Sequence, residues 1–422
     1  MTERRRSTNR RSAVLLVVAL LGVLAGPAKA QSKPLVVDKD RAQCPNADFT
    51  SIQQAVAAAA PNDEIHVCPD LYTESVTIDK PVKLRGRLGA VQAENCFTPA
   101  QASDPTRQAI VDGGDHSFRL AANDILLEGF VVEGATRGID SSDGFSGYLI
   151  RHNLIQRNSL DGVDLHSGGA TTTRAHHNCF RENARGALVS ERGNLHNALI
   201  DHNQSFRNGE GLALVGPGSR TAVRLEHNVS HEDRLVGFAM QNSQESTVAH
   251  NKATALPPAP GQFNFPIVIG GGNLALQISH NDVEGGGSGI LFSLAVFLAR
   301  FPSSTDLEVR GNTVRGAQVD GIRLAGNAVH NSSFIDNQTM DNGRDGISLG
   351  AQNTSNRFER NHARDNRRDG IRVGTGVSGN TFEGNQLRGN GEHDAHDDSR
   401  LANVWVNNHC KTDFPAGTIC VP

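Results

Sequence analysis

Short stretches of alternating apolar and polar residues, separated by Asn and Gly, recur along most of the chain. One mark of the recurrence is an Asn, spaced by 23 to 31 residues, at Asn153, Asn178, Asn203, Asn228, Asn251, Asn281, Asn312, Asn337, Asn361, Asn385 and Asn408. A second mark is a Gly followed by an apolar-x-apolar stretch, at Gly138, Gly162, Gly186, Gly211, Gly289, Gly321, Gly346 and Gly370. Period-two alternation between turn residues predicts short strands, and helical periodicity is absent from this region.

A unit of about 24 residues is too small to bury its own apolar face, so copies must stack on one another. Three short strands per unit, without a crossover helix, predict a coil whose successive turns pair in parallel at about 4.8 Å. Stacking would place the recurring Asn residues in an amide ladder and let the recurring Gly residues take left-handed corners. Apolar residues at alternate positions, such as Ile322 and Leu324 or Ile347 and Leu349, would fill the interior.

A distinct segment precedes these units: FTSIQQAVAAAAPNDEIHVCPDLYTESVTIDKPVKLRG, residues 49–86, followed by AIVDGG and DILLEGFVVEGA. Together with the Asn/Gly units it resembles right-handed parallel β-helix proteins, the architecture of pectate lyases, of alginate lyases and epimerases, and of periplasmic β-helix proteins associated with copper and nitrous-oxide-reductase maturation. The resemblance implies an all-β fold, a right-handed single-stranded parallel β-helix (solenoid) of about 24-residue rungs. It also implies a short N-terminal helix that caps the open coil with Phe49, Ile52 and Val56, and Ser51 or Thr50 is available as its N-cap.

The first thirty residues have the features of a secretory signal peptide. Five arginines precede an apolar run at residues 13–26, and Ala28-Lys29-Ala30 fits small-x-small cleavage, so Gln31 is the expected mature start. The paired Arg10-Arg11 is compatible with twin-arginine export. The alternative is a retained membrane anchor, although the run is shorter than the ~20 apolar residues of a spanning helix. We expect a secreted or periplasmic protein without membrane insertion of the mature chain.

The repeats favour one domain, residues 31–422, rather than the two or three domains that length alone suggests. Within it we expect an N-terminal cap and first rungs at 49–86, regular repeats at 137–408 and a C-terminal cap loop at 409–422. An even count of six cysteines agrees with an oxidising compartment. We expect the disulfides Cys44–Cys68 and Cys410–Cys420, whereas sequence leaves the pairing of Cys96 and Cys179 open.

The charge balance excludes a strongly basic nucleic-acid binder. The chain has 41 Lys+Arg against 45 Asp+Glu, a net charge of −4, which does not supply the cationic surface that phosphate neutralisation needs. An aromatic content of 5% fits a narrow core. The sequence has no match to the signatures of pectin methylesterases or polygalacturonases, and the WIDH segment of lyases is echoed only by IDHN around Asp201-His202. Any chemistry must therefore come from side chains on the coil surface.

The first candidate site combines Asp140, Asp164 and His166. Asp140 and Asp164 each lie two residues after a repeat Gly, so in adjacent rungs the two carboxylates would face outward about 5 Å apart. Such a pair could bind calcium or raise one carboxyl pKa for acid/base work, and His166 could abstract the proton α to a uronate carboxylate. We therefore assign these three as candidate catalytic residues, with the two Asp as candidate calcium ligands. The alternative is a solvated polar face.

A second candidate is the column Asp320, Asp345 and Asp369, each just before a repeat Gly, which could bind calcium. Arg344 and Arg368 stand beside two of them, so neutralised turns explain the column equally well. On the outward position of the same strands, Arg323 and Arg372 are candidate substrate-binding residues, because paired guanidinium donors hold anionic sugars. With Ser348 between them they could equally be solubilising residues.

Histidines precede the recurring Asn in six consecutive units, at His152, His177, His202, His227, His250 and His280. Neighbouring imidazoles could ligate copper or zinc, the interpretation that copper-associated relatives would encourage, or they are simply corner residues. The acidic segment from His393 to Asp398 is a further possible ion site or a solvated loop.

Two neighbouring units carry insertions, near residues 257–266 and 291–302. Their rings, Phe263, Phe265, Phe297 and Phe301, could stack on sugars, with Phe263 and Phe265 as the assigned substrate-binding candidates. The alternative is that they cover one sheet face.

Two classes of function survive. The resemblance favours a secreted protein that binds an acidic polysaccharide or cell-wall polymer and processes it as a lyase or uronate epimerase, with calcium as the one suggested cofactor. The alternative is a non-catalytic extracellular binding or scaffold protein, and a periplasmic copper-handling protein is a third hypothesis. The fold alone does not decide between them.

Overall fold

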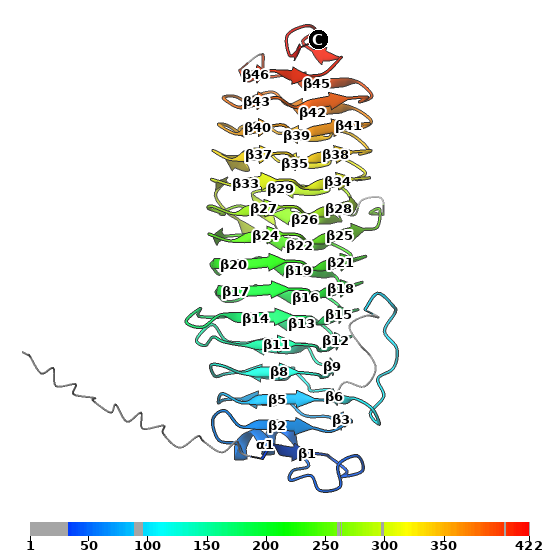
Figure 1. Ribbon diagram of the computed structural model, residues 1–422, viewed down its shortest axis with the longest axis vertical. Coiled ribbons are helices and arrows are strands. Elements are labelled where there is room, and N and C mark those ends of the chain that lie inside the picture. The colour runs from blue at the N-terminus through cyan, green and yellow to red at the C-terminus, as the bar shows by residue number, and fades with distance from the viewer. Residues whose placement is uncertain are drawn as a thin grey trace, which may run out of the picture. The chain divides into compact units, whose positions relative to one another are not determined.

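The structure, a computed structural model, describes residues 33–87, 96–259, 262, 264–296, 299–400 and 402–421. The expected signal peptide, residues 1–30, lies outside this part of the chain. Residues 34–421 form a right-handed parallel β-helix in which each coil adds one strand to each of three parallel sheets. Figure 1 shows the coils stacked in sequence order. The predicted fold class is therefore confirmed.

The three sheets, here A, B and C, have 16, 15 and 14 strands within the described residues. Sheet A contains β1 Leu35–Val37, β2 Glu64–Val67, β5 Lys83–Gly86, β8 Leu126–Glu128, β11 Leu149–Arg151, β14 Thr173–His176, β17 Leu195–Asp201, β20 Arg220–Glu226, β23 Ser243–Gln244, β24 Thr247–Ala249, β27 Gln277–Ser279, β33 Glu308–Arg310, β37 Ser333–Ile335, β40 Arg357–Glu359, β43 Thr381–Glu383 and β46 Val404–Val406. Sheet B contains β3 Asp70–Tyr72, β6 Ala109–Val111, β9 Val131–Glu133, β12 Leu154–Gln156, β15 Cys179–Arg181, β18 Gln204–Phe206, β21 Val229–His231, β25 Lys252–Ala255, β28 Asp282–Gly285, β34 Thr313–Arg315, β38 Gln338–Met340, β41 His362–Arg364, β44 Gln386–Arg388, β47 Asn408–His409 and β49 Cys420–Val421.

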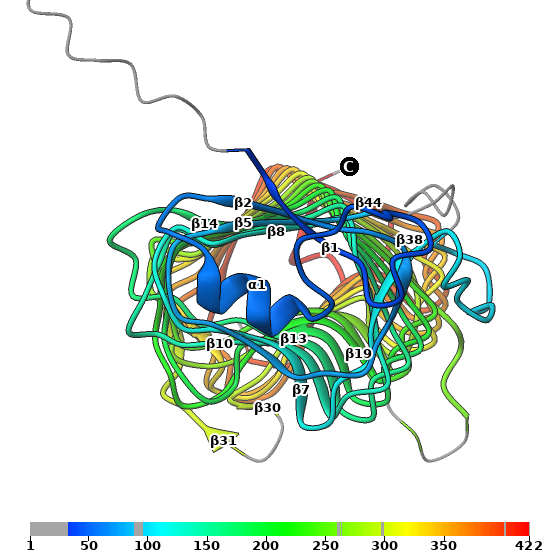
Figure 2. The same cartoon turned by 90° about the horizontal axis from the view of Figure 1, so that it is seen from below.

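Sheet C carries the candidate site. It contains β4 Val76–Ile78, β7 His116–Leu120, β10 Arg137–Ser141, β13 Asp161–Asp164, β16 Gly186–Val189, β19 Glu210–Leu214, β22 Val236–Met240, β26 Phe265–Ile269, β29 Ile290–Phe292, β35 Ile322–Leu324, β39 Ile347–Leu349, β42 Asp369–Val373, β45 His393–Asp397 and β48 Asp413–Phe414. Two small pairs complete the set, β30 Ala295–Val296 with β31 Ala299–Arg300 and β32 Ser304–Thr305 with β36 Val329–His330. The second expected insertion thus forms the β30–β31 hairpin, which projects from the coil in Figure 2.

The recurring Asn residues form the expected amide ladder at the corner between sheets A and B. From Asn153 to Asn408, each Nδ2 donates to Oδ1 of the Asn in the next coil over 2.8–3.1 Å. Each buried amide also satisfies backbone groups, as when Asn203 N–H donates to Asn228 Oδ1. A second ladder, which the sequence analysis missed, runs between sheets B and C from Asn158 through Asn183 and Asn208 to Asp233.

The expectation that the recurring Gly residues take left-handed corners is wrong. None of those eight glycines has a positive φ; the left-handed position belongs to the residue before the ladder Asn, such as His202 with φ 55°. The glycines are needed for close stacking instead. A Cβ on Gly346 would lie 2.5 Å from the carbonyl oxygen of Gly370 in the next coil. Steric contact between coils, and not backbone conformation, therefore selects Gly here.

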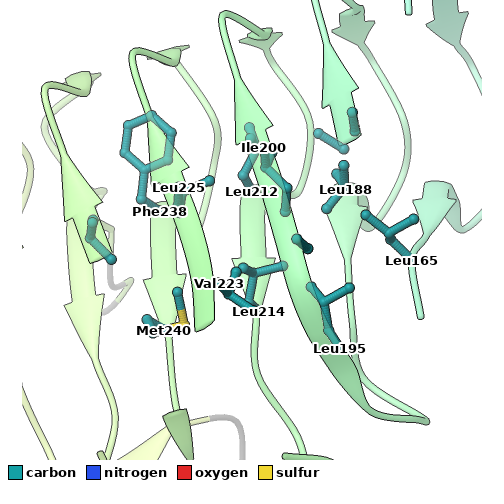
Figure 3. Packing of buried hydrophobic residues seen from close by; sticks show 14 of the residues in the cluster. Leu165, Leu188, Leu195, Ile200, Leu212, Leu214, Val223, Leu225, Phe238 and Met240 are labelled. Atoms are coloured by element: carbon teal, nitrogen blue, oxygen red, sulfur yellow. The ribbon is translucent and has the colours of Figure 1, made fainter. Parts of the chain in front are cut away.

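The interior of the coil is a continuous apolar core, part of which Figure 3 shows from Leu165 to Met240. The predicted interior residues Ile322, Leu324, Ile347 and Leu349 all belong to this core. Towards the C-terminus the core becomes a stack of rings, with centroids 4.0–4.9 Å apart, through Phe334, Phe358, Phe382 and Trp405. Stacking of identical positions in successive coils accounts for this aromatic ladder.

The expected N-terminal helix is present as α1 Ile52–Ala58, which lies across the first coil in Figure 2. Its apolar face buries Ile52 and Val56 in the core, and Ser51 is the N-cap that accepts from Gln54 N–H. The Glu74 carboxylate accepts from Ile52 N–H at 2.8 Å, which satisfies a free donor at the helix start.

Three disulfides join Cys44–Cys68, Cys96–Cys179 and Cys410–Cys420, two of which are the pairs expected from sequence. Residues 409–421, expected as a cap loop, add the strands β48 and β49, which pair with β45 and β47. No helix in the described ranges is long and apolar enough to cross a membrane.

Candidate functional site

The outward side chains of sheet C form one file along the coil axis. In register from coil to coil they are Arg119, Asp140, Asp164, Val189, Ala213, Ala239, Val268, Leu291, Arg323, Ser348, Arg372 and His396. The candidate catalytic pair and the candidate substrate-binding arginines therefore share one face. Eight coils separate Asp164 from Arg372, a distance of about 38 Å at the usual strand spacing.

The structure brings Asp140, Asp164 and His166 together, with one ligand atom of each within 4.8 Å of the others. His166 Nε2 lies 2.8 Å from Asp164 Oδ1. Asp164 is 0% exposed and His166 5% exposed, so the alternative of a solvated polar face is wrong for these two residues. The reason is a loop of the next coil, residues 190–194, whose Arg192 lies over the carboxylates.

Arg192 is the residue that sequence reasoning missed. Its Nε donates to Asp164 Oδ2 at 2.8 Å and its Nη2 donates to Asp140 Oδ1 at 3.0 Å. Burial raises the pKa of Asp164, but hydrogen bonds from His166 and Arg192 outweigh burial and hold that pKa below its usual value. Asp164 is therefore a carboxylate at neutral pH. No motif marks Arg192, because it lies 28 residues from its partner.

More charges surround this triad on the inner side of the loop. Arg185 is bound to Asp161, which is fully buried, and to Glu191. Burial, together with the nearby charge of Glu191, raises the pKa of Glu210 to about 7. Charges at the position before each repeat Gly were visible in sequence, but their assembly into one cluster was not. Shifted carboxyl pKa values of this kind gather at functional sites.

His166 is oriented for one kind of chemistry. Nε2 faces Asp164 Oδ1, so the ring nitrogen that remains is Nδ1, which is buried and has no hydrogen-bond partner. Nδ1 faces Gly193, since a Cβ on Gly193 would lie 2.8 Å from it. The 190–194 loop must therefore move before Nδ1 can reach a ligand.

The column Asp320, Asp345 and Asp369 has the geometry of neutralised turns. All three are buried, and Asp345 and Asp369 accept backbone N–H bonds from the next coil. Arg368 binds Asp345 through two nitrogens. Each carboxylate is thus already bound within the protein, and this favours the structural interpretation of the column.

The two candidate substrate-binding arginines differ in how far they are engaged. Arg372 donates to Asp369 at 3.0 Å and to Asp398 at 2.8 Å. Arg323 has only a 3.9 Å contact with Asp320, and its side chain is 45% exposed. Arg323 is therefore the one whose guanidinium is more accessible to an anionic ligand.

A second cluster of potential metal ligands lies at the C-terminal end of the same file. Asp369, His393 and His396 each offer an atom within 4.8 Å of the others. Their nitrogens lie 3.3 Å and 3.4 Å from the Asp369 oxygens, and Phe414 packs on His396 with ring centroids 4.8 Å apart. Arg372 Nη1 also lies 3.1 Å from His396 Nδ1, so a cation already borders the cluster.

The aromatic candidates of the first insertion divide between two outcomes. Phe265 is partly buried and packs on an outer apolar patch of sheet C formed by Val189, Ala213, Val215, Val236, Ala239 and Val268. Phe265 is the first residue of β26 and pairs with Val236, so it belongs to the face of sheet C itself. Phe263 lies outside the described residues, as does Phe297.

The histidines before the ladder Asn residues lie in one line, and five of the six rings stack on one another. Ring centroids of His177, His202, His227, His250 and His280 follow one another at 4.9–5.2 Å with interplanar angles of 3–14°, and His152 lies 5.2 Å from His177 with a tilt of 31°. Because the rings are nearly parallel, the nitrogen lone pairs of neighbouring rings point in the same direction and do not converge on one point. A metal ion in the plane of one ring would therefore lie outside the plane of the next ring. This geometry disfavours the metal interpretation.

Comparison with known proteins agrees with the fold. A family model described as periplasmic copper-binding protein (NosD) matches residues 267–419, which is about a third of the chain and includes Asp369, His393 and His396. A search of curated proteins finds no significant match.

Several solved structures are similar over most of the chain. The A-module of the Azotobacter vinelandii mannuronan C-5 epimerase AlgE4 has 14% identity and a TM-score of 0.51, covering 85% of this chain and 89% of that one. DFA-IIIase from Arthrobacter chlorophenolicus A6, without its lid and in complex with GF2, has 12% identity and a TM-score of 0.51, with coverages of 89% and 99%. The Dettilon tailspike protein has 16% identity and a TM-score of 0.50, with coverages of 85% and 68%. At these identities the likeness establishes the fold.

Proposed function

We propose that this protein binds an acidic polysaccharide along the outer face of sheet C and processes it, as a lyase or uronate epimerase, at Asp140, Asp164 and His166. The observation that carries the proposal is the buried Asp164–His166 pair, in which Arg192 donates to the carboxylates of Asp164 and Asp140. A similar fold that acts on mannuronan supports the substrate class. Three disulfides support a place of action outside the cytoplasm.

The proposed chemistry is proton transfer at a uronate. Asp164 fixes the imidazole through Nε2, which leaves His166 Nδ1 as the general base, the logic by which a carboxylate orients a histidine in other enzymes. Nδ1 takes the proton from the carbon α to the uronate carboxylate. The resulting carbanion either accepts a proton from water on its opposite face, which epimerises the sugar, or its electron pair breaks the C4–O bond, which leaves an unsaturated sugar. In the second case the departing oxygen takes up a proton from water, and in both cases the imidazolium returns its proton to water. Arg192, half exposed, supplies the positive charge beside the reacting carboxylate.

The outward positions of sheet C also offer a path along which the polymer would bind. From Asp164 the outward positions pass an apolar patch and reach Arg323, whose exposed guanidinium suits a second uronate several sugars away. Phe265 borders this path and remains a proposed contact for sugar rings. Arg372 is the last proposed contact for the polymer, although its guanidinium already donates to Asp369 and Asp398.

Calcium at Asp140 and Asp164 stays a proposal with a specific competitor. Carboxylate oxygens suit Ca²⁺, but Arg192 already binds one oxygen of each residue. A calcium ion would therefore have to displace this guanidinium. Excess EDTA separates a calcium-dependent activity from one that needs Arg192 alone.

The decisive experiment incubates the oxidised protein, residues 31–422, with pectic, alginate and glycosaminoglycan polymers and follows the sugar protons by NMR. New unsaturated or inverted uronate signals, lost in Asp164→Asn and His166→Gln but kept in the distant exposed control Asp336→Asn, would support the proposal. Broadened lines without new signals would mean binding without chemistry, and sharp unchanged spectra with every polymer would refute both parts.

Copper handling is a second candidate, favoured by the position of Asp369, His393 and His396 inside the segment that matches the copper-binding family. Two imidazoles and a carboxylate suit Cu(II), and Arg372 would have to swing away. Calorimetric titration with Cu(II) tests it. A site lost in both His393→Gln and His396→Gln but kept in His166→Gln would support this candidate, and no saturable uptake would remove it.

A further inference from the structure

The six stacked histidines form a regular exposed line that the proposed chemistry does not use. We call His152, His177, His202, His227, His250 and His280 the histidine file. All six are exposed, the side chain of His202 to 49%. Each has a φ of 53–56°, so the left-handed corner directs every ring outward at the same point of its coil. The buried Asn ladder directly below fixes the spacing between rings.

The corresponding corner between sheets B and C also carries a line of outward side chains, but these are of two residue types. Between sheets B and C, left-handed φ values of 52–57° recur at Arg157, Glu182, Arg207 and Glu232. This alternating file carries opposite charges in turn, and Arg207 Nε donates to Glu232 at 2.7 Å. The positive and negative charges of the alternating file therefore cancel near neutral pH. The histidine file contains no acid, and imidazole is the side-chain type that gains positive charge as the pH becomes mildly acidic.

The groups around the histidine file do not cancel this charge. Flanking it are Arg151, Arg174, His176, Asp201, Arg224 and Glu226 on sheet A and Lys252 and Asp282 on sheet B. Asp201 is bound by Arg174 as well as by His202, Glu226 lies 4.0 Å from Arg224, and Asp282 is bound by Arg315. Burial lowers the pKa of His176 to about 4, so this ring stays neutral and adds no charge. Within the file, burial and the charges of His152 and His202 lower the pKa of His177, so this ring is protonated at lower pH than an isolated imidazole. Protonation of the file therefore produces a cationic line with few acids beside it.

We propose that the histidine file, once protonated, binds an acidic polysaccharide chain laid parallel to the coil axis. Five successive ring separations of 4.9–5.2 Å place a regular line of imidazoles along the coil axis, which suits an extended polymer with a negative group on each sugar. Each imidazolium offers N–H donors at its exposed edge, and charge-assisted bonds to carboxylates are the strong ones. The file would thus hold the polymer at mildly acidic pH and release it at neutral pH. This rests on the polysaccharide class proposed above but uses a different face of the coil.

The test measures binding of polygalacturonate to the oxidised protein at pH 5.5 and pH 7.5 at equal ionic strength. We expect at least tenfold tighter binding at pH 5.5, with a steep loss of affinity as salt rises. The triple variant His202→Asn, His227→Asn, His250→Asn should lose the pH dependence. Asn is compatible with the corner, because Asn407 occupies the same position before Asn408 with a φ of 51°. The matched control, Arg207→Gln with Glu232→Gln in the alternating file, should keep it.

Equal affinity at both pH values, or a pH dependence that survives in the triple variant, would overturn the proposal. Turnover of a short oligouronate at pH 7.5 reports separately on the sheet C site. Binding without pH dependence in the unaltered protein, with turnover intact, overturns only the proposal for the file. Loss of turnover in Asp164→Asn with pH-dependent binding intact supports the file by itself.

Discussion

Arg192 and Asp164 are joined across 28 residues of sequence by a hydrogen bond of 2.8 Å from Nε to Oδ2. The bond closes the 190–194 loop over a carboxylate that is 0% exposed, and a second nitrogen of the same guanidinium reaches Asp140. The charge at the candidate site is therefore balanced by a residue of the next coil and not by solvent.

Replacing Arg192 with Gln should lower the free energy of unfolding at pH 7 by about 1–3 kcal/mol, because a buried carboxylate loses its cation. The pKa of Asp164 is held below its usual value, so this stabilisation is present at neutral pH and is lost as pH falls through the folded-state pKa. In the variant the loss should begin at higher pH. Denaturant unfolding across pH measures it, with Arg224→Gln as the exposed control.

The same variant should respond to calcium. Without the guanidinium, Asp140 and Asp164 are free to share an ion, so added Ca²⁺ should raise the Tm of Arg192→Gln more than that of the unaltered protein. An equal response in both proteins would count against a calcium site here.

Removing one amide from the ladder should be costly. Asn228 donates to Asn251 and Ile200 and accepts both the side-chain and backbone N–H of Asn203. Asn228→Ala leaves several buried groups without partners, and we expect a loss of about 3–5 kcal/mol in the free energy of unfolding. Chemical denaturation measures this loss, with the exposed Thr172→Ala as control. A loss below about 1 kcal/mol would mean that water replaces the amide.

Gly346→Ala should destabilise the coil through contact and not through φ. Its Cβ would lie 2.5 Å from the carbonyl oxygen of Gly370, so adjacent coils must separate, and we expect a loss of about 2–4 kcal/mol. At Gly144, where the nearest atom to a Cβ is 3.6 Å away, the same change should have little effect. Thermal unfolding of the two variants distinguishes them, and equal Tm values would contradict the steric explanation.

Asp233→Asn should stabilise the protein at neutral pH. Asp233 ends the second ladder in a fully buried position, and burial raises its pKa to about 6 in spite of bonds from Ser205, Ser230 and Asn208. Its protonated form is favoured by folding, so the unaltered protein gains stability from this group at low pH and loses it as pH rises through about 6. Asn removes the charge, and we expect a gain on the order of 1–3 kcal/mol at pH 7.5 that disappears near pH 4. Urea unfolding at both pH values tests this; a gain of equal size at both would show that the charge is not its cause.

The sequence by itself determined the coil, the Asn ladder, the capping helix with Ser51 or Thr50 as its N-cap, and the register that brings Asp140 beside Asp164. All of these depend on spacing within or between adjacent repeats, and stacking converts a fixed spacing in sequence into contact in space. The left-handed corner was expected at Gly because both Gly and the residue before the ladder Asn suit a turn. Only the packing between coils shows that Gly is selected because a side chain would clash with the next coil, and not because of its backbone conformation.

Only the tertiary structure decided what covers each outer face. The 190–194 loop covers Asp164 and His166, and Asp398 binds Arg372. The positions of these segments depend on contacts outside the repeat, so the repeat pattern of the sequence does not predict them. The pairing of Cys96 with Cys179 belongs to the same class, because a segment outside the coils brings Cys96 to β15.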